Sequence, residues 1–471
     1  MAGQTMATTS MADWRRETGR TLILALPMVG AYVAELGMWW TDQAIVGRLG
    51  ADELAAAGLS GSVMFQGLMV SMGLLSIVAV LVGNAFGAGK PEAVAGAVRQ
   101  GLHIATLLSL IVMVFTWFVP NMLALSGQEP VIVDLAAQYV RAFLFGIAPM
   151  LYFTVLRCFV AGVSRPLVVT LITVMAIPLN LGVNVVLVFG ARLPLGFATV
   201  EIPAMGVAGA AWGSTLVNWL MLAALVADSL WMPAARPYRV FAGLLRHDRH
   251  EWRTIWRLGL PVGMLSFVEG AMFVVVSVLA GLIGIATLAA NQVAGNVVGL
   301  SAMIAMGIGE AAAVRVAQEM GALRPAGARV AGYVAMGLGV VVALVLAVPL
   351  LVAPELLAAM FLDIDDPANA ETLRIVGVLC AIAALFLVFD CLQIVTVRAL
   401  RGLHDTVRPA WISVAGYWVL AVPLAALLAF PLAMDGAGLW LGMAAGLALA
   451  AVWLCLRFAR LSARAGGART C

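Results

Sequence analysis

Long apolar runs separated by short polar links make up most of this chain of 471 residues. We count twelve such runs, centred near residues 35, 70, 109, 147, 178, 217, 270, 303, 340, 386, 420 and 447. A helix of about 20 apolar residues can cross the roughly 30 Å hydrocarbon layer of a bilayer, and a helix satisfies its own backbone hydrogen bonds in lipid. The pattern therefore predicts an all-α polytopic membrane protein with twelve transmembrane helices.

The first half of the chain is repeated in the second half. Shifting residues 24–88 by 234 pairs them with 258–322 without a gap, so that Pro27 matches Pro261 and Glu35 matches Glu269. Later landmarks recur at slightly different offsets, such as Arg141 with Arg374. Each half has six spans, so the two copies share one orientation in the membrane. We expect two six-helix repeat lobes with a central cavity between them, as in parallel-repeat transporters.

The longest internal link lies between these halves and gives the domain boundaries. We predict an N-terminal tail at 1–21, an N-terminal six-helix lobe at 22–229, an inter-lobe linker at 230–252, a C-terminal six-helix lobe at 253–460 and a tail at 461–471.

Basic residues collect on one set of links and tails, including Arg15, Arg16 and Arg20 before the first run and a cluster of arginines around the linker. The opposite links carry few basic residues and several acids, such as Glu129 and Glu201. Because Lys and Arg favour cytoplasmic loops, we expect both termini and the linker in the cytoplasm. The first run is too long for a signal-peptide core, so we expect it to be retained.

Composition supports a membrane protein and gives no sign of catalysis. The chain is 63% hydrophobic and 11% charged, against about 25% charged in soluble proteins. Its five cysteines form no CxxC pair, so neither a zinc site nor a disulfide framework is indicated. No loop-borne nucleophile, metal cluster or cofactor motif is found. We therefore expect no enzyme activity, no cofactor and no nucleic-acid partner, and we expect a monomer in the lipid bilayer.

Five carboxylates fall inside the predicted spans: Glu35, Asp42, Glu269, Glu310 and Asp390. A charge in this position costs at least a few kcal/mol and usually faces a bundle interior or a water-filled cavity. Glu35 and Asp42 are two helical turns apart and share a face. Such acids suit the exchange of a small cation for a cationic substrate. The alternative for each is an ion pair or backbone contact that packs two helices. Arg315 is the partner expected for Glu310 in that case.

Prolines, amides and aromatic rings complete the candidate site. Pro27 and Pro261 each lie eight residues before the paired glutamates, where they can bend the helix that carries the acid. The residues that we expect to line a cavity are Asn180, Asn184 and Gln292, with Trp39 and Phe386 as faces for flat organic cations. The alternative for the rings is core packing or interfacial anchoring.

Several motifs, in order along twelve spans, resemble the multidrug and toxic compound extrusion (MATE) family, and within it the NorM-type bacterial branch. The resemblance covers residues 22–460. It is carried by LALPMVGAYVAELGMWWTDQAIVGRLG in the first span, by LAANQVAGN to AAAVRVAQEMG, and by FDCLQIVTVRALRGLHDTVRP. YVRA at 139, LRCFVAGVSRP at 156 and YW at 417 are similar too.

The resemblance implies export of cationic, often aromatic compounds across the bacterial inner membrane, driven by inward sodium or proton flow. It places coupling-ion binding at Glu269 and Asp390, which would be the metal ligands if the ion is sodium, and a functional site at Asp42 with Asn180. We add Glu310 and Asp42 to the cation-coupling set. We assign substrate binding to Glu35, Asp42, Asn180, Asn184, Gln292, Phe386 and Trp39.

Departures from the family pattern leave the coupling ion open. Phe386 replaces a tyrosine, which removes a possible oxygen ligand and favours protons, whereas Glu310 replaces a small neutral residue and favours sodium if it faces the same cavity. The mechanism that we expect is antiport by alternating access. The alternative is a flippase for lipid-linked oligosaccharides or peptidoglycan precursors. It would need basic groups for its anionic pyrophosphate substrates, and the charges within the spans are mostly acidic.

Overall fold

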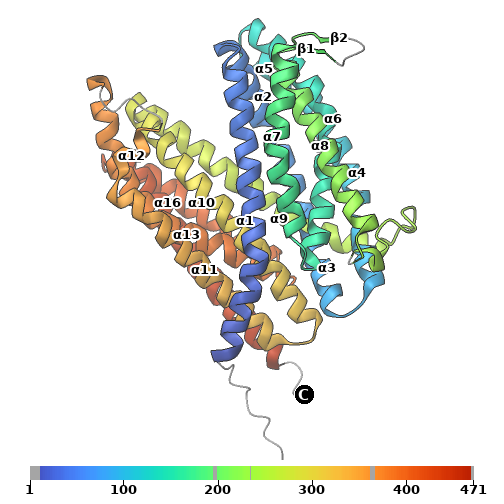
Figure 1. Ribbon diagram of the computed structural model, residues 1–471. Helices are drawn as coiled ribbons and strands as arrows, with labels where there is room; N and C mark the ends of the chain where they lie inside the picture. Colours follow the sequence, from blue (N-terminus) through green and yellow to red (C-terminus); the bar gives the residue numbers. More distant parts are fainter. Residues whose placement is uncertain (1–10, 195–198, 234, 361–365, 468–471) are drawn as a thin grey trace, which may run out of the picture. The chain divides into compact units, whose positions relative to one another are not determined.

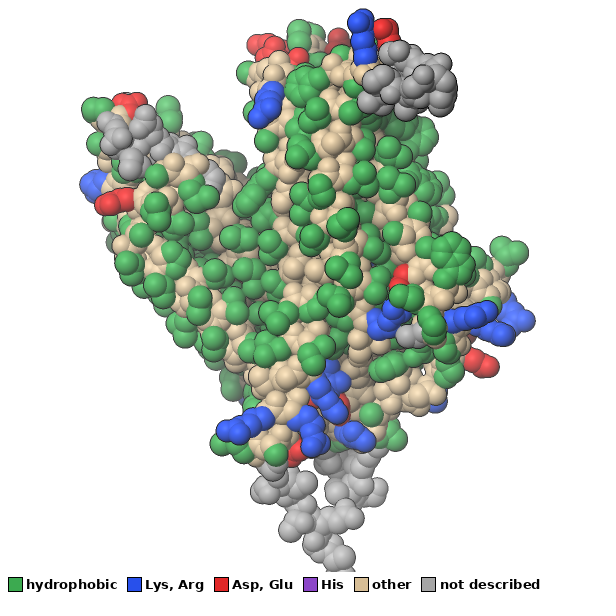
Figure 2. Space-filling model, in the orientation of Figure 1, with side chains coloured by type: hydrophobic (Ala, Val, Ile, Leu, Met, Phe, Trp, Pro, Cys, Tyr) green, Lys and Arg blue, Asp and Glu red, His purple; other side chains and the backbone are tan. Residues whose placement is uncertain are grey.

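Long α-helices form almost all of the computed structural model, which describes residues 11–194, 199–233, 235–360 and 366–467 (Figure 1). Twelve helical segments in this part of the chain are long and apolar enough to cross a membrane, which confirms the predicted count. The spans are α1 (Met11–Gly47), α2 with α3 (Ala51–Leu75, Ile77–Gly87), α4 with α5 (Pro91–Trp117, Val119–Leu125), α6 (Pro130–Gly162), α7 (Leu167–Phe189), α8 (Gly206–Trp231), α9 (Arg249–Ile283), α10 (Ile285–Gly321), α11 (Pro325–Val352), α13 (Ala370–Gly402), α14 with η3 and α15 (Val407–Val414, Ala415–Ala421, Val422–Ala429), and α16 (Asp435–Gly467). Hydrophobic side chains are spread over the helical surface drawn in Figure 2, and charged side chains gather towards the helix ends.

The helices group into two compact units. The N-terminal unit comprises Gly30–Phe86 and Lys90–Gly263, and the C-terminal unit comprises the described residues of Met1–Val29, Gly87–Gly89 and Met264–Cys471. Two long helices, α1 and α9, therefore belong to both units. Each changes unit two residues after its proline, at Val29 and Gly263, and these positions are related by the sequence repeat.

This grouping corrects the boundaries predicted from the sequence. The first turns of α1, up to Val29, pack in the C-terminal unit, although residues 22–29 were predicted in the N-terminal lobe. The first turns of α9, up to Gly263, pack in the N-terminal unit, although residues 253–263 were predicted in the C-terminal lobe. The predicted tail at 1–21 is helical from Met11, and α9 starts at Arg249, inside the predicted linker. Residues 1–10 and 468–471 of the predicted tails lie outside the described residues.

Glycines permit the close packing of the first turns of α1 and α9 in these units. A Cβ atom on Gly259 or Gly263 of α9 would meet the carbonyl oxygen of Leu74 or Val70 at 2.5 Å. In the C-terminal unit, a Cβ atom on Gly307 of α10 would meet the backbone nitrogen of Val29 at 2.6 Å. These distances are shorter than any carbon contact allows, so backbone approaches backbone only because the side chain is missing.

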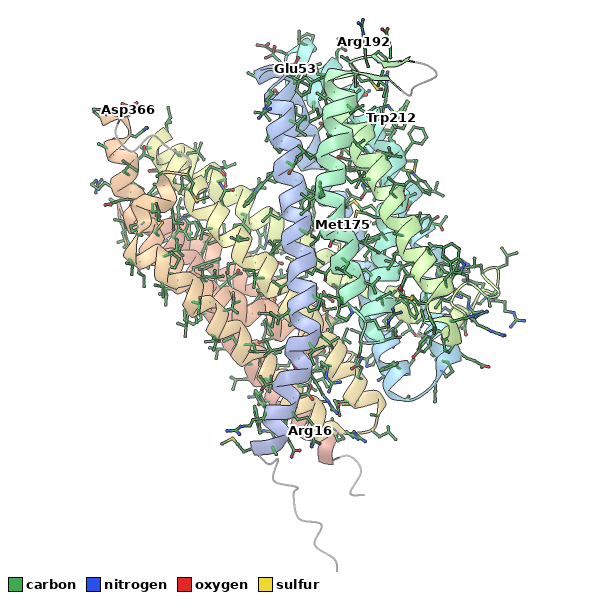
Figure 3. All side chains as sticks on the ribbon, in the orientation of Figure 1. Arg16, Glu53, Met175, Arg192, Trp212 and Asp366 are labelled. Carbon is green, nitrogen blue, oxygen red and sulfur yellow. The ribbon has the colours of Figure 1, made fainter. Side chains whose placement is uncertain are left out.

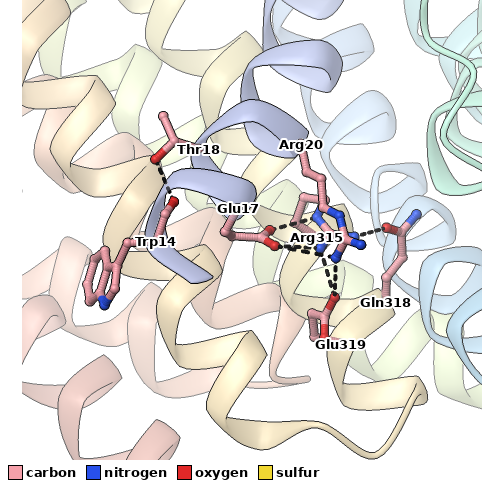
Figure 4. Close-up of polar contacts among 7 residues, drawn as sticks. All are labelled: Trp14, Glu17, Thr18, Arg20, Arg315, Gln318 and Glu319. Atoms are coloured by element: carbon pink, nitrogen blue, oxygen red, sulfur yellow. Dashed lines mark hydrogen bonds and ion pairs between the residues drawn. The ribbon is translucent and has the colours of Figure 1, made fainter. Parts of the chain in front are cut away.

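A buried ion cluster also holds the start of α1 in the C-terminal unit (Figure 4). Arg315 of α10 donates from Nε and Nη2 to the two carboxylate oxygens of Glu17, both at 2.8 Å, and from Nη2 to Glu319 at 2.8 Å. Its Nη1 donates to Gln318 at 2.8 Å. Arg315, Glu17 and Glu319 are each no more than 8% exposed. Arg315 is thus committed to Glu17 and Glu319, and the expectation that it would serve Glu310 is wrong.

Two features of the N-terminal unit were not predicted. Strands β1 (Ala191–Pro194) and β2 (Thr199–Ile202) form an antiparallel hairpin between α7 and α8, with an exposed ion pair of 3.0 Å between Arg192 and Glu201. Arg192 and Glu53 lie at the same end of this unit in Figure 3, whereas Met175 lies partway along α7. The segment before α9, including η1 (Arg236–Tyr238), is held to α4 because Gln100 donates to the carbonyl oxygen of Arg246 at 3.0 Å.

Three short elements lie in the remaining links. They are η1, α12 (Pro354–Ala358) and η2 (Pro367–Asn369).

Candidate functional site

Two of the predicted acids, Glu269 and Asp390, lie within electrostatic range of each other inside the C-terminal unit. Glu269 comes from α9 and Asp390 from α13. Asp390 is 3% exposed, and its Oδ2 atom has no hydrogen-bond partner among the described residues. A buried carboxylate oxygen without a donor is costly. A cation bound at this pair would relieve that penalty.

Tyr417 is the third member of this site. Its side chain is fully buried, and its hydroxyl donates to Oε1 of Glu269 over a long 3.5 Å. The next residue, Trp418, donates from Nε1 to the carbonyl oxygen of Val268 at 3.2 Å. Two consecutive side chains thus hold this part of the eleventh span against the acid-bearing turn of α9.

The backbone around Tyr417 is a π-helix, η3, over Ala415–Ala421. Segments of this kind are rare and recur at functional sites, because the wider turn displaces side chains from their α-helical positions. Gly416 lies against α16, where a Cβ atom would meet that of Ala450 at 2.7 Å. The π-helix and this close contact together fix the position of Tyr417.

A second group of charges lies beside the acid pair. Oε1 of Glu310 accepts a hydrogen bond from Nε of Arg398 at 3.2 Å and forms an ion pair with Arg401 at 3.7 Å. Arg398 also interacts electrostatically with Glu269 and Asp390. These five side chains are three carboxylates and two guanidinium groups. When all are ionised, one negative charge is left uncompensated.

Two further predicted residues, Phe386 and Gln292, belong to this unit. Phe386 is fully buried, with its ring 6.4 Å from that of Phe273 and 5.6 Å from that of Trp440 in edge-on contacts. It packs the core, so the free face expected for an organic cation is absent. Gln292 is exposed.

In the N-terminal unit, Asp42 is held by neutral donors. Asn184 of α7 donates to Oδ1 at 2.5 Å and Ser214 of α8 donates to Oδ2 at 2.8 Å. Asn184 also donates to Oδ1 of Asn180 at 3.3 Å, and both amides are fully buried. Gly213 allows this arrangement, because a Cβ atom there would overlap the amide oxygen of Asn184. The predicted grouping of Asp42, Asn180 and Asn184 is therefore present, and Ser214 joins it.

Glu35 differs from Asp42 because a basic residue neutralises it. Nη1 of Arg157 donates to its Oε1 at 2.6 Å, and the guanidinium carbon of Arg157 lies 5.0 Å from the ring centroid of Tyr32. This pair is the alternative considered for each acid, a carboxylate partnered by arginine, and the assignment of Glu35 to substrate binding stays a prediction. Trp39 is 54% exposed.

Among the described residues, each unit thus contains one acid paired with arginine, Glu35 or Glu310, and an acid group whose charge arginine does not fully cancel. Sequence reasoning named the acids but missed Arg157, Arg398 and Arg401 as their partners, and it listed Tyr417 only within a motif. The available signal was the position of these arginines inside apolar helices. Arg157 and Arg398 also occupy similar places in the two repeats: Arg157 lies five residues before Gly162, and Arg398 lies four residues before Gly402, the repeat counterpart of Gly162.

Comparisons with known proteins agree with this architecture. The MatE family model matches residues 27–186 and 261–427. The chain is 35% identical to a probable multidrug resistance protein NorM of Mesorhizobium japonicum, covering 95% of this chain and 94% of that protein. It is 36% identical to a protein of the same description from Bradyrhizobium diazoefficiens, with the same coverage.

Solved structures give the same fold. The eukaryotic MATE transporter AtDTX14 superposes with a TM-score of 0.83 at 22% identity, covering 96% of this chain and 99% of that one. A mutant MATE transporter of Vibrio cholerae superposes with a TM-score of 0.82 at 15% identity, covering 96% and 98%. Family model, relatives and fold agree over both halves of the chain, which belongs to the MatE family, among its NorM-type members.

Proposed function

We propose that this protein is a secondary active multidrug efflux transporter that exports small organic cations in exchange for inward sodium or protons. The relatives named above are described as multidrug resistance proteins, which supports the transport function. The observation that carries the antiport mechanism is the buried Asp390, whose Oδ2 atom lacks a donor within the described chain, in electrostatic contact with Glu269.

The charge balance of the C-terminal site supports an exchange of one monovalent cation per cycle. With Arg398 and Arg401 beside Glu310, one negative charge remains for the coupling ion. Moving one positive charge against the membrane potential costs about 2.3 kcal/mol per 100 mV, and one entering cation returns it. A one-for-one exchange is then driven by about 1.4 kcal/mol per tenfold gradient of the coupling ion.

The oxygen atoms around Glu269 bear on the identity of that ion. A sodium ion needs several oxygen ligands, and Phe386 lacks the oxygen of the family tyrosine. The hydroxyl of Tyr417, 3.5 Å from Glu269, provides a phenol oxygen from another helix. This arrangement keeps sodium as a candidate, whereas a proton requires only the two carboxylates.

Asp42 is the acid that we assign to the organic cation, as Glu269 and Asp390 are assigned to the coupling ion. Asn184 and Ser214 satisfy its oxygens without cancelling its charge, so that an organic cation can still be attracted to it. Alternating access would couple this site to the acid pair. The flippase alternative is not favoured, because Arg398 and Arg401 are engaged by Glu310 and Arg157 by Glu35.

The cellular setting forms part of the same proposal. The chain is a multi-pass membrane protein. Its similarity to bacterial proteins supports a position in the bacterial inner membrane, and its basic links favour both termini in the cytoplasm. We propose that it works as a monomer without a cofactor and that it is not an enzyme.

Transport in reconstituted vesicles tests the mechanism. Ethidium efflux is followed while a sodium gradient and a pH gradient are imposed separately. We expect one of them to drive transport, and we expect Glu269→Gln and Asp390→Asn to reduce the driven rate more than tenfold. Glu371→Gln is the matched control, since this exposed acid lies in the first turn of α13.

Two results would overturn the assignment. One is transport that neither gradient drives. The other is a pair of acid variants that transport as fast as the Glu371→Gln control.

A further inference from the structure

A groove lies at the end of the N-terminal unit where α4 ends and α6 begins. Its volume is about 510 Å³, and it is bounded by α4, the short helix α5 and the first turns of α6. Trp117, Leu125, Val133 and Val140 provide apolar walls, and Arg141 is the one charged residue of the lining. The floor continues into a buried cluster that includes Val119, Leu123 and Ala136. The groove is therefore a mainly apolar site with one positive charge.

Arg141 differs from several arginines that lie within or beside the spans. Arg157, Arg165, Arg315, Arg398 and Arg457 each pair with a carboxylate. Among the described residues, Arg141 has neither an ion pair nor a hydrogen bond, and its guanidinium carbon lies 5.9 Å from the ring centroid of Trp117. An unpaired charge within a membrane-spanning helix requires a counter-ion from outside the protein or contact with water.

Arg141 lies in the first half of α6, and a long arginine side chain in the outer half of a span can extend to the lipid headgroups. Trp117, whose ring lies beside Arg141, is eight residues before the end of the span that α4 and α5 form. Arg141 lies eleven residues after the first residue of α6, or about 16 Å along the helix. Since α6 has 33 residues and is about 50 Å long, its first turns can project beyond a hydrocarbon layer of roughly 30 Å.

We propose that this groove binds one anionic phospholipid of the adjacent leaflet. Arg141 would hold the lipid phosphate, since a guanidinium group binds phosphate with two parallel hydrogen bonds. The amide of Asn121 is the second polar group of the lining and supplies a further donor. An acyl chain would lie on the apolar side chains of Leu125, Val133 and Val140.

The bound lipid would contact three successive elements, α4, α5 and α6. Helix α5 has only seven residues (Val119–Leu125) and is followed by a turn at Gly127 with φ of 83°. A molecule that binds this space only in the folded protein stabilises the folded state, by an amount that grows with the logarithm of its concentration above Kd. The site is independent of the proposed transport mechanism, so each can fail without the other.

Lipid binding by the purified full-length protein tests this inference. After delipidation in detergent, phosphatidylglycerol is titrated and the bound lipids are counted by native mass spectrometry. We expect one saturable site, which Arg141→Gln weakens at least fivefold and Arg141→Lys weakens less, because lysine keeps the charge but not the planar group. Arg374→Gln is the matched control, since Arg374 is the exposed repeat counterpart of Arg141.

Two further ligands, phosphatidylcholine and inorganic phosphate, test whether the bound phosphate group belongs to an anionic lipid. We expect phosphatidylcholine to bind more weakly than phosphatidylglycerol, because it carries no net negative charge, and we expect millimolar inorganic phosphate not to displace the lipid. The proposal is overturned if both Arg141 variants bind phosphatidylglycerol as the unaltered protein does, if Arg374→Gln weakens binding equally, or if inorganic phosphate displaces the lipid.

Discussion

The buried cluster around Arg315 offers a sharp test of how the first helix is held in place. The substitution Arg315→Gln removes the bidentate contact to Glu17 and the contact to Glu319, all at 2.8 Å. Two carboxylates that are 6% and 8% exposed would then lack their main partner. The nearest other cation, Arg20, is half exposed and lies 4.0 Å from Glu17 and 3.8 Å from Glu319, so it compensates only weakly.

Breaking a buried ion pair by removing one partner costs about 3 to 5 kcal/mol. For a compact unit of this size, 1 kcal/mol corresponds to a Tm shift of about 2 °C. We therefore expect Arg315→Gln to lower the Tm of the purified protein by about 6 to 10 °C, measured by thermal unfolding in detergent at neutral pH.

Arg16→Gln is the matched control, because Arg16 lies exposed in the first turns of the same helix (Figure 3). We expect it to change stability by less than about 0.5 kcal/mol. Adding Glu17→Gln and Glu319→Gln to Arg315→Gln should restore part of the loss, because no buried charge then lacks a partner. Equal Tm values for Arg315→Gln and Arg16→Gln would refute this account of the cluster.

Three further predictions concern the acid pair and one loop. Tyr417→Phe removes a single long hydrogen bond to Glu269, worth about 1 kcal/mol. It should raise the coupling-ion concentration for half-maximal transport about fivefold. An unchanged concentration would show that Tyr417 is not part of the ion site. Arg398→Gln and Glu310→Gln each change the net charge of the site and should slow exchange. The double variant restores the net charge of the unaltered site and should recover part of the rate. A double variant no faster than either single variant would contradict the charge count. Burial lowers the pKa of His404 below its ordinary value of 6.5, so the unfolded chain binds a proton more readily, and stability should fall as the pH drops below about 6.5. Asparagine tolerates the φ of 61° at this position, so the variant His404→Asn should fold and show a smaller fall in Tm between pH 7.5 and 5.5. An equal fall in Tm in both proteins would assign the pH effect to other groups.

Hydropathy alone predicted the number of spans, because the apolar length that a membrane requires is a property of each segment by itself. The repeat was visible for a related reason: Pro27 and Pro261, like Glu35 and Glu269, keep one offset. The acids were recognisable as candidate site residues because a carboxylate is costly within any apolar run.

The partners of those acids were not predictable in the same way. Arg157 is 122 residues from Glu35, Arg398 is 88 residues from Glu310, and Arg315 is 298 residues from Glu17. The nearest arginine in sequence to Glu310 was the expected partner, yet Arg398 is the one that binds it. Proximity along a helix says little here, since ion pairs depend on which faces of distant helices meet.

The sequence by itself determined a twelve-span helical membrane protein built from two related halves, with acids at Asp42, Glu269 and Asp390. Only the tertiary structure decided that the first turns of α1 and α9 pack in the opposite units, that Glu35 and Glu310 are neutralised, and that a π-helix brings Tyr417 to Glu269. The physical reason is that membrane insertion depends on local hydrophobicity. The charge that remains available for a cation depends on contacts between helices distant in the chain.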